Sequence, residues 1–166
     1  MRKLALFIGI ISILLGLNAC EKSYNTLVGE YHYQVSGHVT LGGVRDLIID
    51  HETGSLEIIQ KNATMFMLIF FAEDGNTYTT NATVEGEGVL LDPFYKLLPI
   101  NYYTHETTLL SGTISVLHKE NYQVAVYGMG QLYDDAIIFT LQYNGEELNN
   151  GTKLIGKNIT LIAKTK

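Results

Sequence analysis

The chain contains the residue types that perform acid–base and nucleophilic chemistry, but their spacing matches no catalytic motif. His105-Glu106 begins like a His-Glu-x-x-His zinc-binding helix, yet Leu109 stands where the second histidine is needed. No serine lies in a Gly-x-Ser-x-Gly frame, and no Gly-x-x-x-x-Gly-Lys-Ser/Thr phosphate-binding loop occurs. The sequence therefore predicts a protein that is not an enzyme and that carries no cofactor.

The histidines and acidic residues are also spaced poorly for a metal ion. His32 and His38 share one polar strand face at a separation of about 20 Å along an extended chain, too far apart to bind one ion. Asp134 and Asp135 are adjacent, but calcium needs a cage of about six or more oxygen ligands, so a turn-capping role is favoured. We expect no metal site.

Aromatic residues are better candidates for a functional site. Residues 92–108 are predicted to be one long irregular stretch, because Pro93 and Pro99, the only prolines of the chain, lie within it. A tyrosine has an apolar ring and a polar tip, which suits a small apolar or glycan ligand. The candidate ligand-binding residues, which would form a lip at the mouth of the fold, are Phe94, Tyr95, Tyr102 and Tyr103.

The segment Met65–Phe71 is apolar on both faces. A strand with one face in a core should carry polar residues at Phe66, Leu68 and Phe70, and this strand does not. Something must therefore cover the outer face. Either residues 92–108 fold over it as internal core, or another protein docks there.

The elements that would position these residues are β-strands. Residues 29–164 alternate between apolar and polar with period two in nearly every segment, and turn-forming Asp, Asn and Gly residues separate the runs. The predicted fold class is all-β, an antiparallel meander of about eight to ten strands. Closure into an up-and-down barrel is the first choice because it removes exposed edges, and a two-sheet β-sandwich is the second.

Two Gly-x-Gly pairs, Gly86/Gly88 and Gly128/Gly130, lie within the strand patterns. A sharply curled strand has no room for side chains on its concave face, so these glycines predict tight coiling. A nucleotide-binding loop is excluded because no helix follows either pair.

The amino-acid composition limits the classes of molecule that the protein can bind. The formal charge of the whole chain is −6, and 46% hydrophobic residues against 17% charged residues argue against disorder. Without residues 1–19 the charge becomes 9 − 17 = −8, and Arg45 is the only arginine left. Such a chain is unsuited to nucleic acids, which require clustered positive charge. A single cysteine excludes an internal disulfide.

The N-terminus predicts export and a lipid anchor. Arg2 and Lys3 precede an apolar run over residues 4–17, which has the length of a signal-peptide core and is too short to span a bilayer. Leu17-Asn18-Ala19-Cys20 resembles the lipobox of bacterial lipoproteins. That resemblance implies cleavage before Cys20 and acylation of Cys20, and Glu21 would then resemble an outer-membrane sorting signal. The expected organisation is a signal peptide over 1–19, a lipidated tether over 20–28 and one barrel domain over 29–166.

Together with the strand patterns, the lipobox makes the chain similar to small secreted lipoproteins of Bacteroidetes with lipocalin- or calycin-like barrels. The segments that carry this resemblance are residues 29–37 and 127–145. The resemblance implies an envelope location, most simply the outer membrane of a Gram-negative bacterium, and attaches no activity.

Three functions remain at this stage. The first is a lipid-anchored barrel that binds a small apolar or glycan ligand. The second is a subunit of a cell-surface complex that docks through Met65–Phe71. The third is a hydrolase with paired carboxylates drawn from Asp134 or Asp135 and Glu85 or Glu87, for which retaining chemistry needs a separation of about 5 Å.

Overall fold

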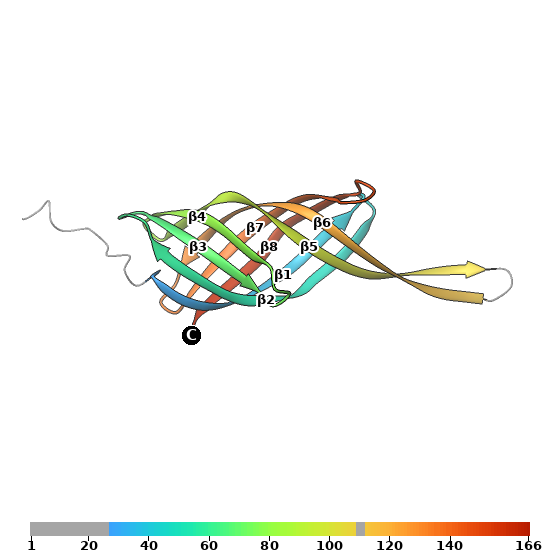
Figure 1. Cartoon of the computed structure of the whole chain (residues 1–166), viewed down its shortest axis with the longest axis horizontal. Helices are drawn as coiled ribbons and strands as arrows, with labels where there is room; N and C mark the ends of the chain where they lie inside the picture. The colour runs from blue at the N-terminus through green and yellow to red at the C-terminus, as the bar shows by residue number, and fades with distance from the viewer. Residues whose placement is uncertain (1–26, 109–111) are drawn as a thin grey trace, which may run out of the picture.

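A computed structural model describes residues 27–108 and 112–166, which form eight antiparallel strands in a closed ring (Figure 1). Cys20 and the signal segment lie outside the described residues. The strands are β1 (Gly29–Leu41), β2 (Arg45–Gln60), β3 (Met65–Ala72), β4 (Thr77–Glu85), β5 (Gly88–Thr108), β6 (Gly112–Leu132), β7 (Ala136–Glu147) and β8 (Lys153–Thr165).

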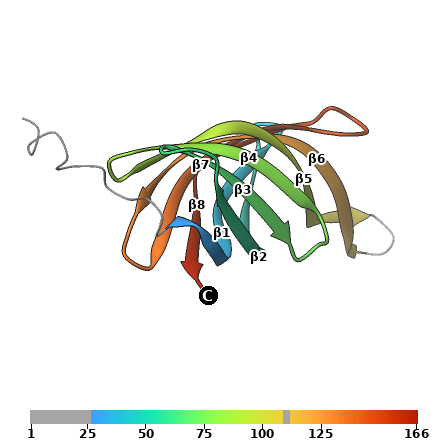
Figure 2. The same ribbon diagram turned by 60° about the vertical axis from the view of Figure 1, so that its left-hand side comes forward.

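Each strand pairs with the next, and β1 pairs with β8 from Tyr31↔Thr165 to Leu41↔Leu154. This ladder closes the sheet on itself, so the predicted up-and-down barrel is confirmed and the two-sheet sandwich is wrong. The ring is not evenly round, and Figure 2 shows the strands arching over a shared interior. Among the described residues no helix is long and apolar enough to span a bilayer.

The core follows the alternation expected from the sequence. Tyr31, Tyr33 and Val35 on β1 are buried, and His32 and Gln34 between them are exposed. Large side chains fill the interior beside β3 and β4, led by Phe66, Leu68, Leu56, Phe139 and Leu141. This half of the barrel is therefore a packed core, with burial as its main stabilising term.

The two glycine pairs differ in role. A Cβ atom on Gly128 would lie 2.4 Å from Leu141 Cδ2, and one on Gly130 would lie 2.6 Å from the Phe139 ring. These glycines therefore leave the space on the concave face that the Leu141 and Phe139 side chains occupy, as predicted. Gly86, however, has φ +62° and lies in the turn between β4 and β5, where a positive φ favours glycine. The prediction that the pair lies within a strand is wrong for Gly86, whereas Gly88 is the first residue of β5.

The face assignment of Met65–Phe71 is also wrong. Phe66, Leu68 and Phe70 point into the core, and Met65 and Phe71 are exposed on the outside. A strand that is apolar on both faces has no alternation from which to choose the inner face, so the prediction was off by one residue. Residues 92–108 do not cover the outer face of β3, where Met65 and Phe71 stay exposed, because this segment pairs with β6.

The predicted irregular stretch over residues 92–108 is the continuation of β5. Its pairing with β6 runs from Gly88↔Gln131 to Thr108↔Gly112, with an irregularity between Leu91 and Phe94. The pairing of β4 with β5 covers only Ala82–Glu85 against Gly88–Leu91. Beyond that point β5 is an edge strand on the β4 side, which is the kind of strand that accepts proline.

This arrangement leaves the barrel open along one side. β3 and β4 are short, and β3 pairs with β2 only from Gly54 onward, so the first half of β2 pairs with β1 alone. The edges of β2 and β5 therefore face each other across an opening. Residues 101–108 and 112–119, here called the arm, extend beyond the ring as a two-stranded ribbon (Figure 1).

Candidate functional site

A cavity of about 310 Å³ lies at the opening between β2, the β3–β4 turn and β5. Leu47 and Ile49 of β2 and Leu98 and Ile100 of β5 form apolar walls. Asp50, Glu52, Glu73 and Asp74 supply the polar part of the lining. Small-molecule sites commonly have volumes of about 300–1,000 Å³ and a mostly apolar lining with a few polar groups, and this cavity has that character.

The two rows of side chains across the opening run antiparallel and meet at both ends. At the outer end, the Arg45 guanidinium lies 4.3 Å from the centroid of the Tyr102 ring. At the inner end, Lys96 of β5 reaches Glu52 of β2. The long side chains of Arg45 and Lys96 thus connect β2 and β5, which the short β3–β4 hairpin leaves unpaired with each other. The apolar walls of the cavity lie between these two contacts.

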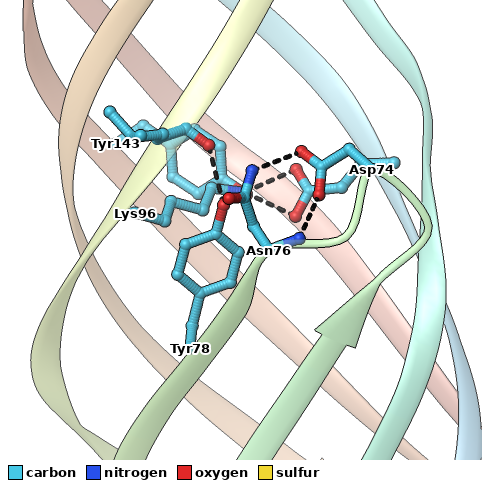
Figure 3. Close-up of polar contacts among 7 residues, drawn as sticks. Asp74, Asn76, Tyr78, Lys96 and Tyr143 are labelled. Atoms are coloured by element: carbon cyan, nitrogen blue, oxygen red, sulfur yellow. Dashed lines mark hydrogen bonds and ion pairs between the residues drawn. The ribbon is translucent and has the colours of Figure 1, made fainter.

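The inner end is a buried polar cluster (Figure 3). Lys96 Nζ donates to both carboxylate oxygens of Glu52, at 2.6 and 2.5 Å, and lies 2.7 Å from Tyr143 Oη. Lys96 is only 5% exposed. Burial lowers the pKa of the Lys96 amine from its usual 10.5, and the charge of Glu52 opposes that shift.

Tyrosine and threonine side chains bridge β4 to β5 where the backbone ladder stops. Tyr78 Oη donates to the Leu97 carbonyl at 3.0 Å, and Thr80 Oγ1 donates to the Asp92 carbonyl at 2.7 Å. Burial, together with the charges of Asp74 and Glu52, raises the pKa of Tyr78 to about 12. Burial also raises the pKa of Tyr143, with a further contribution from Glu52.

Among the described residues no buried side-chain nitrogen or oxygen lacks a hydrogen-bond partner. The three protons of the Lys96 ammonium group are matched by the two Glu52 oxygens and the Tyr143 oxygen. In the same part of the chain no three His, Cys, Asp or Glu residues gather as a metal site would require. The cluster closes the inner end of the cavity, and all of its polar groups have hydrogen-bond partners.

The structure does not bring the four predicted aromatic residues together. Phe94 is half-buried and stacks on Phe70 with ring centroids 5.8 Å apart, so it belongs to the core. Tyr102 stacks on His118 at 4.8 Å and donates to Glu120 Oε1 at 2.9 Å. Tyr95 and Tyr103 point outward and are 68% and 65% exposed. The four rings therefore form no shared lip, because period two along β5 sends neighbouring side chains to opposite faces, and their role in ligand binding stays a prediction.

Other predicted residues lie away from the cavity. Asp134, Asp135, Glu85 and Glu87 are exposed at hairpin ends and do not line it. Sequence reasoning missed the Lys96, Glu52 and Tyr143 cluster, because its members come from three different strands. The available signal was a lysine at an inward position between Phe94 and Leu98, where every neighbour on that face is apolar.

Comparison with known proteins adds little to this description. No protein-family model and no curated protein matches the chain. Among solved structures, one described as a redesigned beta barrel is similar over 89% of this chain and 97% of its own, with 12% identity and a TM-score of 0.39. The fold assignment rests on the strand ladders themselves.

Proposed function

We propose that the protein is a lipid-anchored bacterial envelope protein that binds a small, largely apolar ligand in the cavity between β2 and β5. The observation that carries this proposal is the contrast between the two halves of the barrel. One half is filled with its own side chains, and the other half opens to a cavity of about 310 Å³ with walls of Leu47, Ile49, Leu98 and Ile100.

The polar side chains that line the cavity favour a ligand with one apolar and one polar end. Asp50, Glu73 and Asp74 lie at the rim, and the Lys96–Glu52 pair closes the inner end. An apolar group would displace water from the walls, which is the main source of affinity in such sites. A polar end of the ligand would stay near the rim, where solvent and hydrogen-bonding side chains are both available.

The anchor rests on the N-terminal sequence. A single acyl chain binds a membrane only marginally, and two or more hold a protein stably. The lipobox-like quartet ending at Cys20 would supply such an anchor on the outer membrane. We expect the wild type to incorporate an alkyne-labelled fatty acid in cells, and Cys20→Ala to lose that label because the acylated residue is gone. Fatty-acid labelling of the Cys20→Ala protein equal to that of the wild type would contradict a lipid anchor at this residue.

Ligand binding is tested with N-phenyl-1-naphthylamine, a neutral dye that fluoresces in apolar sites. The wild type should bind the dye, and Leu47→Trp should lose binding because the larger side chain fills the cavity. Ile155→Trp adds the same bulk at an exposed position of β8 and is the matched control. Equal fluorescence with the wild type and Leu47→Trp would contradict the proposal.

A second candidate function, docking in a surface complex through Met65–Phe71, has one observation in its favour. The outward residues Met65, Met67, Ile69 and Phe71 form an apolar row, and Met67 pairs across strands with Ile59 of β2. A photo-crosslinking amino acid at Ile69 should then trap one discrete adduct in cells, and the same amino acid at exposed Gln34 should trap none. Absence of an adduct at Ile69 would remove this candidate.

A further inference from the structure

The outer face of β5 and β6 carries exposed aromatic residues, in contrast to the outer face of β1. The outward residues of β1 are all polar: Glu30, His32, Gln34, Ser36, His38 and Thr40. On β5 and β6 the outward positions include Tyr95, which is 68% exposed, and Tyr127, which is 45% exposed. Large exposed aromatic rings on one face of a soluble protein indicate an interaction site.

Strand register creates a hollow between these two rings. Tyr95 lies opposite Ala125, and Tyr127 follows Ala125 by two residues on the same face of β6. Ala125 in turn lies opposite Asn144 of β7. Because the alanine side chain is one methyl group, the surface dips there, and a shallow groove of about 650 Å³ forms between the tyrosines and β7.

The groove offers unused hydrogen-bonding groups. The side-chain amides of Gln123 and Asn144 line it, and neither has a partner among the described residues. Each amide presents donors and an acceptor. Three charged residues line the groove: Glu146 and Lys153 form an ion pair with each other, and Glu147 is 3% exposed and accepts hydrogen bonds from the backbone amides of Asn149 and Asn150.

We infer that this groove binds a neutral oligosaccharide. A sugar ring has an apolar C–H face, which suits the exposed tyrosine rings, and hydroxyl groups, which suit amides that both donate and accept. The exposed charges of Glu146 and Lys153 neutralise each other, and the Glu147 carboxylate is buried and already hydrogen-bonded, so these residues give an ionic ligand no advantage over a neutral one. Tyr95 and Lys96 are adjacent and point to opposite faces of β5, so the groove is a site separate from the interior cavity.

Affinity electrophoresis tests this inference in gels that contain starch, laminarin, xylan or galactomannan as soluble neutral probes. At least one probe should retard the wild type. Tyr95→Ala and Tyr127→Ala should each weaken that retardation by about fivefold or more, because each removes one stacking surface. Tyr103→Ala and Tyr133→Ala are the matched controls, since they remove exposed tyrosines outside the groove.

Retention of the wild-type mobility shift by both control variants, and its loss in both groove variants, would support the inference. Thermal melts check that all four variants fold, which is expected because the replaced rings are exposed. The inference is overturned if no probe retards the wild type, or if the groove variants and the controls behave alike. Leu47→Trp should leave the retardation unchanged, which separates this site from the proposed interior ligand site.

Discussion

Lys96 is the residue whose placement most needs explanation. It stands on the inward face of β5 among apolar neighbours, and burial of an unpaired ammonium would be prohibitively unfavourable. Glu52 and Tyr143 satisfy it, so the cluster is tolerated. A buried ion pair adds little net stability compared with apolar residues of similar volume, but removal of one partner leaves the other charge uncompensated.

Lys96→Met should therefore destabilise the fold by about 3 kcal/mol or more, because the Glu52 carboxylate loses its counter-charge in a largely buried position. Urea unfolding measures this change. Lys96→Met combined with Glu52→Gln should recover most of the loss.

Lys153→Met is the matched control, because Lys153 pairs with Glu146 at the surface and its side chain is 63% exposed. This change should alter stability by less than about 1 kcal/mol. Equal effects of Lys96→Met and Lys153→Met would contradict the structural role given to the buried cluster.

The half-buried Tyr78 and the buried Tyr33 and Tyr143 predict a loss of stability at alkaline pH. Burial raises the pKa of Tyr78 to about 12, whereas an unfolded tyrosine has its ordinary value of 10.0. The unfolded chain therefore releases this proton first, and the stability present below pH 10 is lost as pH rises from 10 to 12. Tyr33 and Tyr143 act in the same direction.

Urea unfolding at pH 9 and pH 11 checks this expectation. Burial lowers the pKa of Lys96, so this residue makes the folded state more stable as pH rises toward its usual pKa of 10.5, opposite to the effect of the tyrosines. The tyrosine effect should therefore be measured in the Lys96→Met, Glu52→Gln background. Equal unfolding free energies at the two pH values in that background would contradict the burial of these hydroxyl groups.

At the scale of elements, the arm is the most independent part of the molecule. Its two strands pair with each other beyond the point where β6 leaves β7 at Tyr122↔Glu147. A two-stranded ribbon is only marginally stable alone, and the arm contributes little to the barrel core. Tyr102 and His118 lie directly opposite each other at its base.

Replacement of residues 103–117 with Asn-Gly should join Tyr102 to His118 through a two-residue turn. We expect the thermal midpoint to change by only about 4 °C or less, since the barrel ladder is retained. Failure of the shortened protein to fold would show that the arm is needed for the barrel.

The sequence predicted elements better than it predicted the site. Alternation identified the strands and the inward residues of β1 correctly, because those strands have one polar face. It failed at β3, where both faces are apolar, and at β5, where prolines usually signal an interruption. Pro93 and Pro99 are accommodated because β5 has left β4 by then. The Lys96, Glu52 and Tyr143 cluster depends on register between distant strands, which local patterns do not encode.

At the scale of the whole molecule, the closed ladder and the side opening have a common cause. The β3–β4 hairpin is shorter than the strands that flank it, so the ring is complete at one end and open at the other. β1 begins at the end of the ring opposite the arm (Figure 1).

The central claim is that the opening between β2 and β5 holds a ligand. The most direct measurement is an amide NMR titration of the protein with N-phenyl-1-naphthylamine. We predict saturable shifts centred on Leu47, Ile49, Leu98 and Ile100, which line the cavity. Shifts confined to the outer face of the barrel, or no saturable shifts, would contradict the claim.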